Sequence, residues 1–229
     1  VTQTVESGRA APVARFLAVR SLSEQLAAPL SAEDQTVQSM PDASPTKWHL
    51  AHTTWFFETF VLRPHAPGYR DFDPAYAYLF NSYYEAVGPR HPRPQRGLIS
   101  RPGVEEIMAY RQHVTGAMAE LLERGSANVG ALVELGLHHE QQHQELILMD
   151  AKHMLSLNPL RPANRPASHA VVNDARPLDW IRVDGGLVEI GHEGEGFAFD
   201  NEGPRHRIWL EPFALASRPT SCAEYLAFI

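Results

Sequence analysis

Two histidines four residues apart are the feature of this chain that most directly suggests chemistry. They end the pentad His139-Glu140-Gln141-Gln142-His143, which lies in a long proline-free segment with apolar residues at helical spacing. Positions i and i+4 of a helix lie about 40° apart around its axis, so both imidazoles project from one face. Such a pair can hold a metal ion, and the pentad also has the HExxH pattern of zinc proteases.

A zinc protease needs a third ligand beyond the pentad. One expected ligand is a histidine six residues after the second histidine, with a glycine between the two. In this chain Met149 occupies that histidine position, Leu146 occupies the glycine position, and no glutamate lies between residues 146 and 188. Asp150 and Asp174 stay open as alternative ligands, but the pattern argues against a protease.

A better third ligand lies in an aromatic-rich segment nearer the N-terminus. His49 and His52 are three residues apart there, and His52 lies within the apolar and aromatic run 51–57. A buried imidazole at that position would need a polar partner. Because one helix of a bundle can offer a single imidazole to a pair on another helix, we expect His52, His139 and His143 to form a metal triad. Three imidazoles are compatible with zinc and with non-haem iron.

Each candidate residue also has a simpler interpretation. Histidines beside Gln and Glu on a surface helix can be solvated polar residues, as we expect for His138 and His153. A single histidine on an aromatic face, such as His52, is more often a satisfied core residue than a ligand. The arginines of residues 90–101 can form a solvated basic loop. The joint occurrence of these features is what favours a metal site.

Composition restricts the class of protein. The 229 residues are 44% hydrophobic and 21% charged, which is typical of one large domain or one domain and part of another. A net charge of −7 without a Lys/Arg cluster on a helix argues against nucleic-acid binding. The single cysteine, Cys222, excludes an internal disulfide. With no secretion signal and no apolar run of membrane length, we expect a cytoplasmic protein without a membrane partner.

Helical periodicity and boundary residues predict a bundle. The four predicted helices span residues 12–30, 48–62, 102–124 and 131–157. Ser44 can cap the second helix with Pro45 at its first position, Pro102 opens the third, and Gly125 ends it. The loop 63–101 is rich in proline and aromatic residues, which favours a packed and functional loop. An up-down four-helix bundle with one elaborate loop follows.

The composition changes after the fourth helix. A proline-rich segment without periodicity, residues 158–179, is expected to be a linker. Short strands and the first turns of a helix are expected after it, at residues 180–190, 207–215 and 223–229. We therefore expect a helical domain over 1–157 and the beginning of a second domain over 180–229, interrupted at Ile229.

Two long strings resemble the ergothioneine-forming sulfoxide synthases. They are SPTKWHLAHTTWFFE at 44–58 and HEQQHQEL at 139–146. The stretch from VDGG at 183–186 to NEGPRH at 201–206 looks like the start of the second domain of that family. The resemblance implies a mainly α protein, in which a DinB-like four-helix bundle is followed by a truncated α+β, C-type-lectin-like domain of the formylglycine-generating-enzyme type.

The same resemblance implies a metal and a reaction. It places mononuclear non-haem iron, Fe(II), at the junction of the two domains, with His52, His139 and His143 as its ligands. The reaction couples a thiol to C2 of the imidazole ring of hercynine (trimethylhistidine) with O2 and oxidises the sulfur to a sulfoxide. Iron suits this reaction because zinc has no redox chemistry. Glu140 is then a flanking polar residue and not a protease base.

The resemblance also implies substrate contacts. The spacing of Arg90 and Arg93 resembles the family's arginine pair for the carboxylates of gamma-glutamylcysteine, with Arg96 as the competing assignment. Gln142 is similar to a family glutamine near the substrates. The family's catalytic tyrosine and the residues for the trimethylammonium group lie deeper in the second domain. Tyr225 comes too early to be that tyrosine, so no catalytic residue is assigned.

These inferences give a leading hypothesis and two alternatives. We expect a monomer that uses hercynine, gamma-glutamylcysteine and O2, and a 229-residue chain that binds iron but turns over poorly by itself. One alternative is a zinc-dependent hydrolase or thiol transferase on a DinB-like bundle. The other is a non-catalytic binding module whose histidines are structural.

Overall fold

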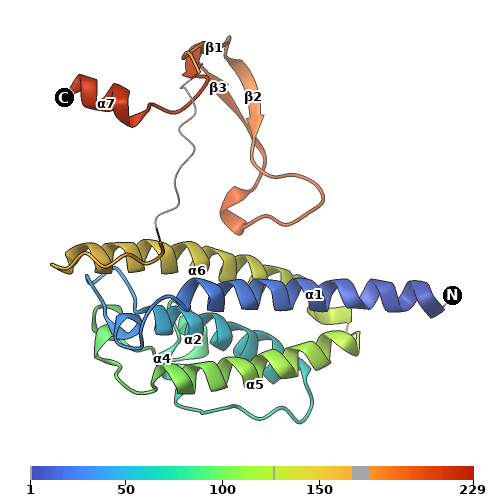
Figure 1. Cartoon of the computed structure of the whole chain (residues 1–229). Coiled ribbons are helices and arrows are strands. Elements are labelled where there is room, and N and C mark those ends of the chain that lie inside the picture. Colours follow the sequence, from blue (N-terminus) through green and yellow to red (C-terminus); the bar gives the residue numbers. More distant parts are fainter. Residues whose placement is uncertain (1, 126, 167–175) are drawn as a thin grey trace. The chain divides into compact units, whose positions relative to one another are not determined.

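Figure 1 shows the protein in a computed structural model, which describes residues 2–125, 127–166 and 176–229. The chain divides into two compact units, Val1–Ala167 and Ser168–Ile229. The expected linker falls across this division, and its residues 167–175 lie outside the described part.

Four long helices make up most of the first unit. They are α1 (Thr2–Ala27), α2 (Thr46–Phe57), α5 (Val104–Glu123) and α6 (Gly130–Leu157). Figure 1 shows them side by side, and both α1 and α2 pack against α5 and against α6. The predicted mainly α fold, a helical bundle followed by a small β region, is therefore confirmed.

Two helix starts differ from the prediction. Helix α1 begins at Thr2, so that Pro12 lies inside the helix and not at its start. Pro45 is the N-cap of α2 and not its first residue, and no side chain caps this end. Ser44 therefore does not act as the predicted cap, and its hydroxyl accepts a hydrogen bond from Arg96 at 2.9 Å.

The second predicted helix changes its winding near its end. Beyond α2 the chain forms a π-helix (Glu58–Leu62) and the short α3 (Arg63–His65). Glu58 is fully buried and accepts hydrogen bonds from the hydroxyls of Tyr69 and Tyr110, each at 2.6 Å. This carboxylate therefore ties the end of α2 to the following loop and to α5.

The long connection between α2 and α5 is packed, as predicted. It contains α4 (Tyr76–Leu79) and two 3₁₀ turns, η3 (Glu85–Val87) and η4 (Arg93–Leu98). Tyr76 and Phe80 are buried, and their ring centroids lie 5.0 and 6.4 Å from that of Tyr110. The loop thus completes the aromatic core and holds its own backbone against α2.

Three glycines fix where α5 and α6 lie. Gly103 is the N-cap of α5, so Pro102 stands just outside the helix and does not open it. Gly125 ends that helix with φ +74°, as predicted. On α6, a Cβ at Gly136 would lie 2.6 Å from a ring carbon of Phe57. This close approach brings α2 and α6 together, and both helices carry candidate ligands.

Two antiparallel pairs of strands form the second unit. The strands are β1 (Trp180–Val183), β2 (Gly186–Ile190), β3 (His206–Leu210) and β4 (Phe213–Ala216). Strand β1 pairs with β4, and β2 pairs with β3. Each predicted strand is thus divided in two. Gly185, with φ +75°, breaks the first, and Pro212, which has no N–H to donate, lies between the two halves of the second.

The remaining helical elements are short. The predicted C-terminal helix is α7 (Cys222–Phe228), whose cap Ser221 accepts a hydrogen bond from the backbone N–H of Glu224 at 3.2 Å. Further 3₁₀ turns are η1 (Asp34–Thr36), η5 (Ala127–Val129) and η6 (Asp200–Glu202). In the described part of the chain, no helix has the length and apolar character needed to cross a membrane.

Candidate metal centre

The three histidines predicted as metal ligands lie together between α2 and α6. His52 comes from α2, and His139 and His143 come from successive turns of α6. Their ring centroids are 4.6 to 4.9 Å apart, and one possible ligand atom from each ring lies within 4.8 Å of the other two. This distance allows all three to bind one metal ion.

Burial keeps these imidazoles neutral. Desolvation lowers the pKa of His139 to about 4, and it lowers the pKa values of His52 and His143 well below the ordinary value. The charges of neighbouring histidines add to the effect for His52 and His143. Near neutral pH each ring therefore has a nitrogen lone pair, which is the form that binds a metal.

His52 is held by a hydrogen bond and by two stacked rings. Its Nδ1 lies 2.6 Å from the carbonyl oxygen of Phe80, which can only accept, so Nδ1 carries the proton and Nε2 the lone pair. The ring stacks between Trp48 and Trp55, with centroids 4.6 and 5.5 Å away. A backbone carbonyl from the long loop thus orients a ligand on α2. No residue type in the sequence could have indicated this contact.

His139 has an unused nitrogen in the interior. Its Nδ1 is buried and has no hydrogen-bond partner among the described residues. Its ring lies 5.0 Å from that of Phe56, so the surroundings are apolar. Because buried polar atoms are normally satisfied, this unpaired nitrogen fits a site that is completed by a metal ion. Three neutral nitrogen donors suit iron and zinc equally.

His143 is connected to Asp150 through His49. Its Nδ1 lies 2.9 Å from Nδ1 of His49, and Nε2 of His49 lies 3.0 Å from Oδ2 of Asp150. Asp150, an alternative metal ligand in the sequence, is thus bound to His49 and stands outside the cluster. Burial lowers the pKa of His49, although the hydrogen bond to Asp150 opposes this effect. The other alternative ligand, Asp174, lies outside the described residues.

The histidines open onto a cavity of about 550 Å³. Of the predicted substrate contacts, Arg93 and Gln142 line this cavity, whereas Arg90 is not among the lining residues. The Arg90 guanidinium instead lies over the ring of Tyr83 at 5.7 Å. Arg96, the competing assignment, lines the cavity. Arg93 and Arg96 thus line the same cavity, whereas Arg90 does not.

Neither cavity arginine forms a salt bridge with a described residue. No carboxylate in the described part of the chain forms a salt bridge with Arg93 or Arg96, and the Nε atom of each is buried without a hydrogen-bond partner. The guanidinium of Arg96 lies 3.4 Å from the ring centroid of Trp48 and donates to Ser44 and Ser82. Although the charge of Arg93 helps to lower the pKa of Asp150, neither guanidinium is engaged by a described carboxylate in a salt bridge, and both are suited to a carboxylate ligand.

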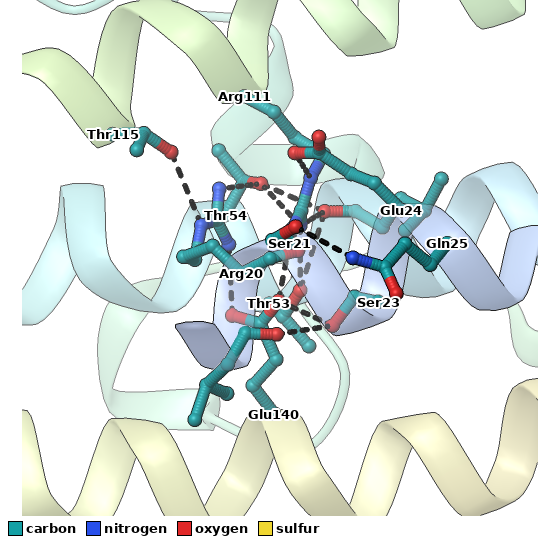
Figure 2. A network of polar contacts seen from close by, with 12 residues as sticks. Arg20, Ser21, Ser23, Glu24, Gln25, Thr53, Thr54, Arg111, Thr115 and Glu140 are labelled. Atoms are coloured by element: carbon teal, nitrogen blue, oxygen red, sulfur yellow. Dashed lines mark hydrogen bonds and ion pairs between the residues drawn. The ribbon is translucent and has the colours of Figure 1, made fainter. Parts of the chain in front are cut away.

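Glu140 belongs to a separate polar cluster, drawn in Figure 2. It is fully buried, not merely a flanking polar residue, and its two oxygens accept hydrogen bonds from Arg20 and Arg111 at 2.9 Å. Ser23 donates a further hydrogen bond at 2.7 Å. With both oxygens occupied and no place in the cavity lining, Glu140 is not positioned as a protease base.

Two other histidines of α6 lie outside the metal centre. His138 contacts Glu134 through Nε2 at 2.9 Å, and His153 contacts the hydroxyl of Ser39 through Nδ1 at 2.8 Å. Both rings are partly exposed. Neither lines the cavity, in agreement with their interpretation as ordinary polar residues.

Relatives of this chain agree with the resemblance found in the motifs. The chain is 30% identical over 201 residues to the hercynine oxygenase of Mycolicibacterium thermoresistibile, covering 82% of this chain and 41% of that protein. It is 26% identical over 191 residues to the hercynine oxygenase of Mycobacterium tuberculosis, covering 82% and 43%. The ergothioneine biosynthesis protein 1 of Neurospora crassa matches at 25% identity over 144 residues, which are 56% of this chain and 16% of that protein.

The matched lengths limit how far these similarities extend. The chain spans about two fifths of the length of the two hercynine oxygenases. A profile of the DinB superfamily matches residues 15–147, a range that contains His52 and both histidines of the α6 pentad. This match covers more than half of the sequence and coincides with the helical bundle. The chain therefore belongs to the DinB superfamily.

Proposed function

We propose that this chain carries the metal and thiol-donor site of a hercynine-oxygenase-type enzyme. The reaction joins gamma-glutamylcysteine to hercynine with Fe(II) and O2 and gives a sulfoxide. The observation that carries the proposal is the cavity in which three neutral imidazoles meet two arginines that form no salt bridge with any described residue. The names of the relatives support the same pathway.

The donor set suits a redox metal with free coordination positions. His52, His139 and His143 would hold the ion and leave further positions for substrates. Iron would supply the redox chemistry with O2 that the reaction requires, which zinc cannot. The stacked tryptophans around His52 and the apolar surroundings of His139 would limit water at this site.

Arg93 and Arg96 would bind the carboxylates of the thiol donor. A guanidinium presents a planar pair of N–H donors that matches a carboxylate. In gamma-glutamylcysteine two carboxylates are available, whereas free cysteine has one, so a pair of arginines favours the dipeptide. Gln142 is exposed at the edge of the same cavity, where its amide can hydrogen-bond a polar group of either substrate.

Metal content and ligand binding test this proposal directly. The chain is purified without oxygen, its metal is quantified, and the binding of gamma-glutamylcysteine and of cysteine to the Fe(II)-loaded protein is measured by calorimetry. We expect one metal ion per chain and tighter binding of the dipeptide. Oxygen consumption on adding hercynine then reports on the reaction itself.

Two outcomes would favour the alternatives. Stoichiometric zinc, with no oxygen consumption in the presence of hercynine and thiol, would contradict the oxygenase and favour a zinc hydrolase or thiol transferase. A double substitution, His139→Ala with His143→Ala, that leaves the metal content unchanged would favour a binding module with structural histidines.

A further inference from the structure

We propose that His49 and Asp150 are positioning residues that fix His143 as a metal ligand through its Nε2 atom. This inference rests on the metal triad of the proposed function. It assigns a role to two buried side chains that are not themselves part of the triad, with 2% and 6% of their surface exposed. They would act through His143, by deciding which of its two nitrogens carries the proton.

The donor and acceptor roles in these contacts can be assigned beginning with Asp150. Its Oδ2 accepts a hydrogen bond from the backbone N–H of Ser44 at 2.9 Å. A backbone N–H can only donate, so this carboxylate oxygen is an acceptor. The same oxygen lies 3.0 Å from Nε2 of His49, which must therefore donate. The proton of the His49 ring is thus placed on Nε2.

The position of the proton on His49 then determines its position on His143. A neutral imidazole has one protonated nitrogen and one lone pair, so Nδ1 of His49 is left as an acceptor. That atom lies 2.9 Å from Nδ1 of His143, which must carry the proton shared in this contact. The lone pair of His143 is consequently on Nε2. The ring is both oriented and fixed in one tautomer.

A second proposed ligand, His52, is also fixed in one tautomer by a neighbouring group, which supports the proposed role of His49 and Asp150. The carbonyl of Phe80 holds the proton of His52 on Nδ1 in the way that His49 does for His143. Partners beyond the ligands commonly set tautomer and orientation in metal sites. Because Asp150 and His143 both belong to α6 while His49 belongs to α2, the relay also joins the two ligand-bearing helices.

The affinity for a metal ion tests the role of the relay. Zn(II) is titrated against a competing chromophoric chelator, and Fe(II) is titrated in the same way without oxygen. His49→Phe keeps a ring but removes the acceptor, and we expect the affinity to fall roughly 10- to 100-fold. His153→Phe, a substitution on α6 outside the cavity, is the control and should leave the affinity within about twofold.

A conservative change separates positioning from a general effect on folding. Asp150→Asn retains an oxygen that can accept from both Ser44 and His49, so its loss of affinity should be smaller than that of Asp150→Ala. Long-range ¹H–¹⁵N spectra of the metal-free protein report the tautomer independently of any metal. We expect the proton of His143 on Nδ1 in the wild type and a mixture of tautomers in His49→Phe.

The outcomes distinguish the two proposals. A wild-type protein that binds no metal would overturn the proposed function and this inference with it. A wild type that binds metal, together with a His49→Phe variant of equal affinity, would overturn the inference alone. A wild-type His143 protonated on Nε2 in the metal-free spectra would overturn it as well.

Discussion

Two polar clusters lie next to each other on α6, and they differ in how completely they are satisfied. Glu140 is bound to Arg20, Arg111 and Ser23, so both of its oxygens have partners within the protein. One residue earlier, His139 has a buried Nδ1 without a partner among the described residues. A buried polar group that is fully paired holds a structure together, whereas an unpaired one beside a cavity indicates a ligand.

The clusters also connect different parts of the fold. The network in Figure 2 takes Arg20 from α1, Thr54 from α2, Arg111 from α5 and Glu140 from α6, so it joins all four long helices. Arg111 also pairs with Glu24 at 3.2 Å, which balances the two cations with two carboxylates. The histidine cluster uses α2 and α6 alone and faces a cavity. The first cluster should therefore control stability and the second metal binding.

The largest effect is expected from removing the charge of Glu140. Glu140→Gln would leave Arg20 and Arg111 buried without a full counter-charge, and breaking such a pair costs about 3–5 kcal/mol. The free energy of unfolding in urea measures this loss. Glu145→Gln changes an exposed carboxylate of the same helix and should alter stability by less than about 0.5 kcal/mol. Equal losses in the two variants would contradict the role of the network.

The ion pairs of Glu140 should also make the free energy of unfolding depend on pH. Burial alone would raise the pKa of Glu140, but the charges of Arg20 and Arg111 outweigh it and lower this pKa to about 2. In the unfolded chain the pKa of a glutamate is about 4.3. The stabilisation from these ion pairs is therefore complete above about pH 5, and it is lost as the pH falls toward the lower pKa that Glu140 has in the folded protein. The difference in unfolding free energy between wild type and Glu140→Gln should shrink by roughly 3 kcal/mol over this range. A difference that stays constant from neutral pH to pH 2 would refute this assignment.

Substitutions in the histidine cluster should affect metal affinity more than the stability of the metal-free protein. In His139→Ala we expect metal affinity to fall by more than the roughly 100-fold upper range typical of outer partners, because a ligand itself is lost. Stability of the metal-free protein should fall by less than in Glu140→Gln, because the Nδ1 atom has no protein partner to lose among the described residues and the ring borders a cavity. Chelator competition and urea unfolding measure the two quantities. A metal-free variant as unstable as Glu140→Gln would remove the distinction between the clusters.

These two clusters were not equally visible in the sequence. The histidine spacing and the helical periodicity predicted that His52, His139 and His143 could meet, and they do. The relay to His143 was missed because Asp150 could equally be a ligand, and only geometry shows which atom it contacts. The contact from Phe80 could not be predicted, because every residue has the same backbone carbonyl.

The Glu140 network leaves only a partial signal in the sequence. Arg20 lies four residues after Phe16 and next to Val19, within the apolar stripe of its helix, and it is separated from Glu140 by 120 positions. Arg111 lies between Ile107 and Val114 in the same manner. A charge on an apolar face requires a partner, but the sequence does not say which of many carboxylates supplies it. That choice depends on the packing of all four helices.

A smaller effect is expected at the cavity arginines. Arg96→Lys replaces a planar fork by a point charge, and loss of one charge-assisted hydrogen bond costs about 1.5–3 kcal/mol, or roughly tenfold or more in affinity for gamma-glutamylcysteine. Calorimetry with the metal-loaded protein measures this change. Arg90→Lys, outside the lining, should bind within about twofold of the wild type. The reverse order would favour the original pairing of Arg90 with Arg93.

The smallest effect is expected from a second ion pair between the same two helices. Arg15 of α1 donates to both oxygens of Glu134 of α6 at 2.5 and 2.8 Å, but the two side chains are 49% and 33% exposed. Water can replace such a contact, so Glu134→Gln should cost no more than about 1 kcal/mol in urea unfolding, even though Glu134 also contacts His138. The pairs Arg15–Glu134 and Arg20–Glu140 share their chemistry and their helices and differ in burial. If both substitutions destabilised the protein equally, burial would not be what makes the Glu140 network important, and the contrast with the histidine cluster would need another cause.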